Sequence, residues 1–288
     1  MTVKRTVALV LMLLALGVAL GESRAARISG SEDMQRLVLV EYLGGTTALV
    51  SRHERIAGEW VELDTAWGYV GRTGMGKTRE GDNRTPLGVY DLTTPFGLLD
   101  DPDSAQPYLK VTPYHYWCST SGSEYYNQLV DSRETGREAK GADEVLIDYP
   151  GFYDYAMFID YNAEGVDGRG AAIFLHCICG RDWTHGCIAV PTDYMRTVVR
   201  WAERPTKIAI LDGPLEDVSG GVLVTTARAW VRSGPGTDSA AVDRLWAYQR
   251  MDYLGETRTD AEGTRWYWVR HQGQARWVSE RQAQLIAP

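Results

Sequence analysis

Short apolar runs separated by glycine-rich turns make up most of this chain. Residues 36–42, 156–161 and 171–175 are rich in aliphatic, β-branched and aromatic side chains, which predicts buried strands. Further strands are predicted at residues 46–52, 59–63 and 67–70. The glycine-rich stretch 71–82 predicts a loop. This pattern is typical of a mainly β protein.

One segment has helical periodicity instead. Apolar positions recur at helical spacing within residues 194–201, and Pro205 follows them, which predicts a helix that ends before the proline. Residues 206–211 return to a strand pattern. Together these elements predict one mainly β unit over residues 35–212, with a few helices.

The sequence pattern changes after residue 212. Residues 213–221 begin with Gly-Pro and end with Gly-Gly, and we interpret them as a linker. Over residues 222–288, short strands recur at a spacing of roughly ten residues with glycine turns between them. This pattern predicts a second, small β-barrel.

The N-terminus has the layout of a secretory signal peptide. Lys4 and Arg5 precede an apolar run over residues 6–20, and small residues follow it. A membrane-spanning helix needs about 20 apolar residues, more than this run contains. We therefore predict that residues 1–25 are a signal peptide and that the protein is exported to the periplasm, cell wall or medium. An uncleaved N-terminal anchor is the alternative.

Composition adds two exclusions. The 288 residues are 44% hydrophobic and 24% charged, which excludes a disordered, collagenous or coiled-coil protein. The formal net charge is −8, and no run of Lys or Arg offsets it. A nucleic-acid partner or an anionic membrane surface is therefore not expected.

The reactive side chains are concentrated between residues 176 and 187. His176, Cys177, Cys179, His185 and Cys187 all lie in this stretch, directly after a predicted buried strand. A thiol is a nucleophile when a base or a positive field removes its proton, and either histidine could supply that base. A tight turn at a glycine lets successive backbone N–H groups form an oxyanion hole for acyl transfer.

Three interpretations of this cluster are open. Cysteine is often buried for packing alone. Cys-x-Cys followed by His-x-Cys uses zinc-type ligands, although the spacing is neither a knuckle nor a ribbon and an oxidising compartment disfavours thiolate clusters. The third interpretation, a Cys/His acyltransferase, is the one we favour because two histidines and three cysteines are hard to assign to packing.

The stretch Thr184-His185-Gly186-Cys187, with a histidine upstream, resembles the signature of the L,D-transpeptidase (YkuD-like) catalytic domain. The resemblance extends over residues 35–212 and includes short stretches similar to those of one branch of the family, at residues 71–74, 80–88, 125–127 and 161–162. It implies a β-sandwich catalytic domain with Cys187 as nucleophile and His176 as general base and acid. It also implies an oxyanion hole from the Gly186 and Cys187 amides, His185 as a secondary residue that shapes the loop, and neither a cofactor nor a metal.

The implied reaction is acyl transfer on peptidoglycan stem peptides, which would serve as donor and acceptor. The thiolate attacks the carbonyl of the third residue of a tetrapeptide stem, D-Ala leaves, and the amine of a neighbouring stem resolves the thioester to give a 3→3 cross-link. Water as acceptor would make the protein an L,D-carboxypeptidase, and a non-catalytic wall-binding protein is a further alternative. The NlpC/P60-type peptidases are disfavoured because their Cys precedes the His.

The C-terminal segment is similar to bacterial SH3 (SH3b) domains, which commonly hold enzymes on peptidoglycan. The similarity rests on residues 231–236, 263–269 and 275–278. It implies an SH3-like β-barrel over residues 222–288 that contacts the wall. A packing module without a ligand is the alternative.

Three further cysteines, Cys118, Cys177 and Cys179, remain after Cys187 is assigned. A bridge from Cys118 to one of the other two is our first expectation for an exported protein. Three reduced, buried thiols, or a regulatory bridge from Cys177 or Cys179 to Cys187, are the alternatives.

Overall fold

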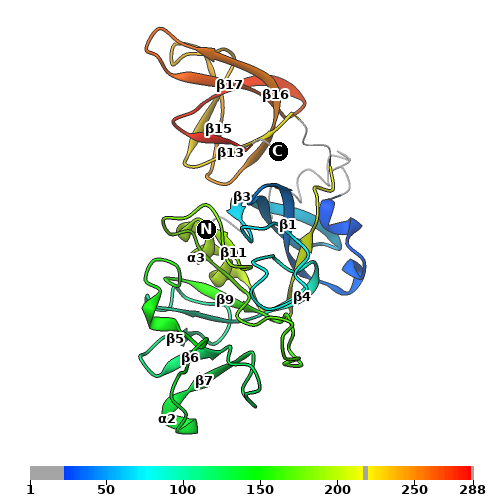
Figure 1. The fold of residues 1–288 in the computed structure, drawn as a ribbon. Coiled ribbons are helices and arrows are strands. Elements are labelled where there is room, and N and C mark those ends of the chain that lie inside the picture. The colour runs from blue at the N-terminus through cyan, green and yellow to red at the C-terminus, as the bar shows by residue number, and fades with distance from the viewer. Residues whose placement is uncertain (1–22, 217–219, 287–288) are drawn as a thin grey trace.

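The computed structural model describes residues 23–216 and 220–286, so most of the predicted signal peptide lies outside the described residues. Strands dominate it, as predicted (Figure 1). Within the described ranges, no helix combines the length and hydropathy that crossing a bilayer requires.

Eight strands of the larger sheet close into a ring. The order is β12-β1-β2-β3-β11-β10-β9-β4, and β12 pairs both with β1 in parallel and with β4 antiparallel. The predicted sandwich is therefore a closed barrel in which the shared strand β12 removes both free edges. The strands are β1 (Arg36–Gly44), β2 (Thr47–Ile56), β3 (Glu59–Tyr69), β4 (Gly88–Gly97), β9 (Ala156–Ile159), β10 (Phe174–Cys177), β11 (Ile188–Val190) and β12 (Thr206–Leu211), and β5 (Leu109–Lys110) extends β4.

Strand β3 is continuous where two separate strands were predicted. Its polar middle pairs with β2, and Asp64 there forms a salt bridge with Arg52 across the ladder. Because each charge has a partner, the polar positions do not interrupt the strand.

One long helix, α3 (Thr192–Trp201), completes the barrel core. It begins two residues before the predicted helix and ends where predicted. Tyr194, Met195, Val198 and Val199 are fully buried in the same cluster as the inward side chains of the barrel. Full burial of such a side chain stabilises the fold by about 1.5–3 kcal/mol.

A three-stranded sheet covers one outer side of the barrel. It has the order β7 (Gln128–Asp131), β6 (His115–Cys118), β8 (Glu144–Val145), followed by η3 (Leu146–Asp148), and the short helix α2 (Ser132–Thr135) follows β7. Trp117 of β6 packs on Phe158 of β9 and Phe174 of β10, with ring centroids 4.5 and 5.1 Å away. A second aromatic core therefore lies on the outside of the barrel, between it and β6–β8 (Figure 1).

A second sheet of seven strands forms the C-terminal part, at the top of Figure 1. It has its own core around Leu223, Val231 and Val269, and it meets the barrel at Tyr248, whose carbonyl accepts from Thr65 N–H at 2.8 Å. Its strands are β15 (Ala241–Leu245), β14 (Ala229–Arg232), β18 (Gln274–Ser279), β17 (Arg265–His271), β16 (Arg250–Thr259), β13 (Val222–Thr225) and β19 (Ala283–Ile286), in sheet order.

The first described residues pack against the barrel. Two 3-10 turns, η1 (Arg24–Arg27) and η2 (Ser31–Asp33), lie before β1. Arg24 is buried and forms ion pairs with Glu41 and Glu62, and Ala25 is fully buried beside them. Because Glu41 is itself fully buried, Arg24 is its compensating charge.

Candidate active site

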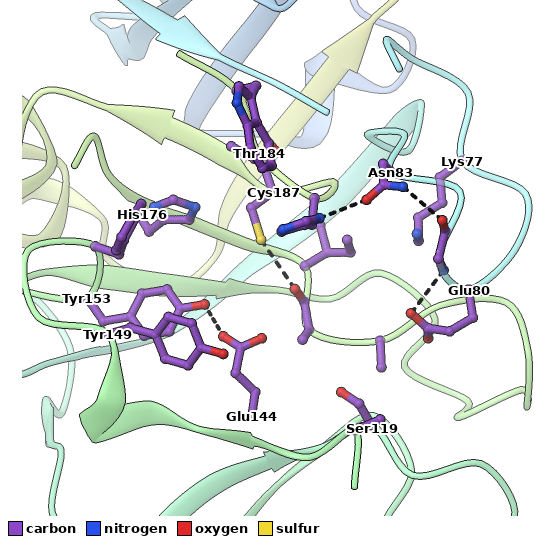
Figure 2. Close-up of a pocket in the computed structure, with 18 of the residues that line it drawn as sticks. Lys77, Glu80, Asn83, Ser119, Glu144, Tyr149, Tyr153, His176, Thr184 and Cys187 are labelled. Carbon is purple, nitrogen blue, oxygen red and sulfur yellow. Dashed lines mark hydrogen bonds between the residues drawn. The ribbon is translucent and has the colours of Figure 1, made fainter. Parts of the chain in front are cut away.

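Strands β10 and β11 place His176 and Cys187 on the same face. They are parallel neighbours in which His176 pairs with Ala189, and Cys187 comes two residues before Ala189. Side chains alternate along a strand, so Phe174, His176, Cys187 and Ala189 share one side. Leu175, Cys177, Ile188 and Val190 take the other side and fill the barrel. Cys187 and His176 therefore face outward, into a cavity of about 540 Å³ between the barrel and the three-stranded sheet (Figure 2).

The Cys187 thiol is protonated in this environment. Its Sγ donates to the Ala172 carbonyl at 3.3 Å (Figure 2). It also accepts from Phe174 N–H at 3.4 Å. Burial, reinforced by the negative charge of Glu144, raises the pKa of the thiol to about 12. The resting site is a neutral thiol beside a base rather than a preformed thiolate.

His176 is oriented as that base. Its Nδ1 lies 2.9 Å from the Cys177 carbonyl, which can only accept, so Nδ1 carries the proton and Nε2 has a free lone pair. Burial lowers its pKa to about 4, which keeps the ring neutral. The ring of Tyr153 packs edge-on against it, with centroids 5.6 Å apart, and fixes its plane.

His185 has a different environment. Its side chain is exposed, and its Nδ1 donates to Asn83 Oδ1 at 2.7 Å. Trp183 packs edge-on against the ring, at 5.0 Å between centroids. His185 therefore connects its loop to the loop that carries Asn83. Of the two histidines, the free lone pair and the shared strand face favour His176 as the base.

The loop before Cys187 depends on a hydroxyl and a glycine. Thr184 Oγ1 donates to the Cys187 carbonyl at 2.7 Å and accepts from Gly186 N–H at 3.1 Å. Gly186 has φ of +139°, and a Cβ there would lie 2.8 Å from the Arg84 carbonyl oxygen, so no other residue fits. Among the described residues the Cys187 N–H has no acceptor, whereas the Gly186 N–H is occupied by Thr184. The predicted oxyanion hole therefore has one open donor, and the second opens only when Thr184 releases it.

The loop between β3 and β4, which begins with the predicted glycine-rich stretch, supports this turn. Thr85 is fully buried, accepts from Gly71 N–H at 2.8 Å and donates to the Cys187 carbonyl at 3.3 Å. Thr184 also exchanges backbone hydrogen bonds of 2.9 Å with Val70 and Arg72. The residues that precede the nucleophile are thus held by the end of β3 and by the loop that follows it.

Asn127 is a positioning residue that the sequence did not assign. Its Oδ1 accepts from Trp117 Nε1 at 2.9 Å and from Ala172 N–H at 3.1 Å, and its Nδ2 donates to two carbonyls of the 161–162 turn. Through Ala172 it fixes the carbonyl that binds the Cys187 thiol. The only sequence signal for Asn127 is the Tyr-Tyr-Asn stretch at residues 125–127, which forms part of the family resemblance.

Glu144 and Tyr153 are two further cavity residues without a sequence signal (Figure 2). The Tyr153 hydroxyl donates to the Glu144 carboxylate. Burial raises the pKa of Glu144 to about 7 and the pKa of Tyr153 well above its ordinary value.

The remaining cysteines do not form the expected bridge. Cys118, Cys177 and Cys179 are all free. Cys118 is buried in a small cluster with Tyr116 and Val130, whereas Cys177 faces the barrel interior, so the two belong to different cores. Cys177 also lies on the opposite side of the strands from Cys187, which contradicts both a shared metal site and a direct regulatory bridge between these two sulfurs.

Comparison with known proteins identifies one family. The model of the L,D-transpeptidase catalytic domain (YkuD) matches residues 46–210, more than half of the chain. This range contains β2 to β11 and nearly all of β12, and it includes both His176 and Cys187. A search of curated proteins finds no match.

Proposed function

Because the chain belongs to the L,D-transpeptidase catalytic domain (YkuD) family, we propose that it is a peptidoglycan L,D-transpeptidase that forms 3→3 cross-links through Cys187. The observation that carries the proposal is the pairing of β10 with β11, which brings a thiol and a neutral imidazole with a free Nε2 to one cavity. The cavity is large enough for a few residues of peptide.

The first half-reaction follows from this geometry. As the thiol attacks the carbonyl of the third stem residue, its proton passes to His176 Nε2 and the C–S bond forms. The oxyanion accepts from the Cys187 N–H, with the Gly186 N–H as the second donor once Thr184 releases it. Collapse of the intermediate breaks the C–N bond, and the proton on Nε2 goes to the amine of the departing D-Ala.

The second half-reaction reverses these roles. His176, neutral again, takes a proton from the amine of an acceptor stem as that amine attacks the thioester. The C–S bond breaks, and the thiolate recovers its proton from His176. Water in the place of the amine would give the tripeptide product of an L,D-carboxypeptidase.

Analysis of reaction products tests the proposal. Purified protein and a disaccharide-tetrapeptide should give D-Ala and a 3→3 cross-linked dimer, identified by fragmentation in mass spectrometry. Cys187→Ala should abolish both products, and Cys179→Ala, a matched change in the same loop outside the cavity, should retain them. Formation of the tripeptide without the dimer would indicate a carboxypeptidase. Formation of D-Ala or dimer by Cys187→Ala would contradict the mechanism.

We also propose that residues 222–288 are an SH3-like domain that binds the wall. Two exposed tryptophans support this: Trp230 lies beneath Arg244 and Trp246 beneath Arg228, with 4.8 and 4.0 Å from guanidinium carbon to ring centroid. Exposed aromatic rings are typical of saccharide and peptide contact sites. Because Tyr248 of this part packs into the barrel core, deleting the part would damage the barrel.

Point variants avoid that damage. Trp230→Ala with Trp246→Ala should reduce cosedimentation with purified sacculi several-fold and leave turnover of soluble muropeptides unchanged. Tyr114→Ala removes an exposed aromatic ring outside this sheet and serves as the control. Unchanged cosedimentation of the double variant would contradict the proposal.

Export is the third proposal, and the buried N-terminal residues refine its boundary. Loss of Arg24 would leave Glu41 buried without its partner, at a cost of about 3–5 kcal/mol. We therefore expect signal cleavage before Arg24 rather than after Ala25. N-terminal sequencing of the exported protein tests this, and a mature chain that starts at Ala26 would contradict it.

A further inference from the structure

Glu144 is a cavity carboxylate on the wall that faces the nucleophile. It begins β8 of the three-stranded sheet, and its side chain points up toward Tyr153 and the space below Cys187 (Figure 2). The sheet and the barrel thus bring an acid and a thiol, 43 residues apart in the chain, to the same cavity.

This carboxylate has no cationic partner. Its side chain accepts from the Tyr153 hydroxyl, and in the described part of the chain no Lys, Arg or His nitrogen lies within 4.0 Å of it. The two cations that line the cavity are engaged elsewhere. Lys77 pairs with Asp82 at 3.0 Å, and Arg181 lies over the rings of Phe152 and Trp183.

An acid without a cation is costly in a desolvated cavity, and it is most easily stabilised by a positive charge on the ligand. Glu80, the other cavity glutamate, also accepts from a tyrosine hydroxyl, that of Tyr126, but it lies at the opposite end of the cavity. Figure 2 places Glu144 on the His176 side and Glu80 on the Lys77 side. Glu144 is therefore the acid nearer the proposed general base.

We propose that Glu144 is a specificity-determining residue that binds the protonated side-chain amine of a diamino acid in the stem peptide. This inference rests on the proposed function, and it names which chemical group of the stem the site selects. An ammonium group and a carboxylate form a charge-assisted hydrogen bond, which an uncharged side chain of the same length cannot replace.

The same contact affects the nucleophile. The negative charge of Glu144 contributes to the raised pKa of the Cys187 thiol. An ammonium bound at Glu144 cancels that charge and so favours the thiolate when a cognate stem is present. Substrate binding and activation of the thiol are thus coupled through one carboxylate.

Acylation of the full chain with two donors tests the proposal. The donors are a tetrapeptide with a diamino acid at its third position and an analogue in which norleucine replaces it. Intact-mass detection of the thioester in the absence of acceptor should show a preference of at least about tenfold for the amine-bearing donor. Glu144→Gln should reduce that preference to within about twofold, whereas Glu80→Gln should preserve it.

A second arm separates the donor amine from the acceptor amine and checks the fold. In this arm, dimer formation is compared between acceptors that carry the amine and acceptors that lack it. If the preference appears only there, and not in acylation, Glu144 binds the amine of the acceptor. Glu144→Gln should also speed alkylation of Cys187 by iodoacetamide at pH 8 in the absence of peptide. In a misfolded variant, alkylation of the other cysteines would speed up as well, so faster alkylation at Cys187 alone indicates an intact fold.

The outcomes distinguish the two proposals. Equal use of both donors and both acceptors by the wild-type protein, or a preference that survives Glu144→Gln, would overturn the role of Glu144 and leave the proposed function intact. Acylation of no stem peptide would overturn both.

Discussion

Cys177, in β10, and Cys187, which directly precedes β11, are both buried, yet only Cys187 shares a cavity with a histidine. Burial raises the pKa of each thiol to about 12. Cys177 faces the barrel interior and donates to the Tyr155 carbonyl, whereas Cys187 faces a cavity that also contains His176. We therefore expect the reactivity of a cysteine in this protein to depend on which side of β10 and β11 its sulfur occupies.

The largest expected effect comes from replacing each of these cysteines by alanine, which removes the sulfur. Cys187→Ala should lower D-Ala release by at least about 10³-fold because no group replaces the nucleophile. Cys177→Ala should retain activity within a few-fold and lose about 1–2 kcal/mol of unfolding free energy through the missing core contacts. Release assays and urea denaturation measure both, and an inactive but folded Cys177→Ala protein would break the comparison.

The second expected effect concerns pH. A raised thiol pKa means that the thiolate fraction of Cys187 is small at neutral pH and grows about tenfold per pH unit up to pH 10. Alkylation of Cys187 by iodoacetamide, followed by peptide mass spectrometry, should rise without a plateau over that range. A plateau near pH 7 would instead indicate a preformed thiolate–imidazolium pair.

A smaller effect is expected from the turn that holds Cys187. Gly186→Ala forces a left-handed φ and a clash with the Arg84 carbonyl, so it should lower kcat by about 10–100-fold and the unfolding free energy by about 1–3 kcal/mol. Steady-state kinetics and thermal denaturation provide the measurements. Wild-type kinetics in this variant would mean that the turn does not position the nucleophile.

The smallest expected effect is that of His185→Asn, and a change at His176 provides the comparison. His185→Asn removes one exposed hydrogen bond to Asn83 and should lower kcat less than about tenfold, whereas His176→Gln removes the base and should lower it by about 10²–10⁴-fold. The reverse order would assign the base to His185.

The sequence predicted the elements of the site that are local in the chain. The apolar runs that became β9, β10 and β12 and the helical periodicity of α3 each depend on neighbouring residues, and so does the Thr-His-Gly-Cys turn. The barrel closure depends on β12 pairing with both β1 and β4, which are more than 100 residues away from it. No local pattern encodes that pairing, and the sandwich that we expected was what the family resemblance implied.

Other features depend on charges and partners that only folding brings together. Glu144 belongs to no motif that the sequence analysis identified, and only the fold brings it to the cavity opposite Cys187. The expected Cys118 bridge was wrong because spacing does not reveal that Cys118 and Cys177 pack in different cores. The family resemblance implied that the Gly186 amide contributes to an oxyanion hole, whereas in the folded chain this amide donates to Thr184 Oγ1.

The most direct test of the central claim is to locate the acyl group. The protein would be mixed with a tetrapeptide donor, quenched in acid within the first turnover, digested, and mapped by mass spectrometry. We predict a tripeptide thioester on the peptide that contains Cys187, present in the wild-type protein and reduced by at least about 10²-fold in His176→Gln. An acyl group on another residue, or undiminished acylation without His176, would contradict the account.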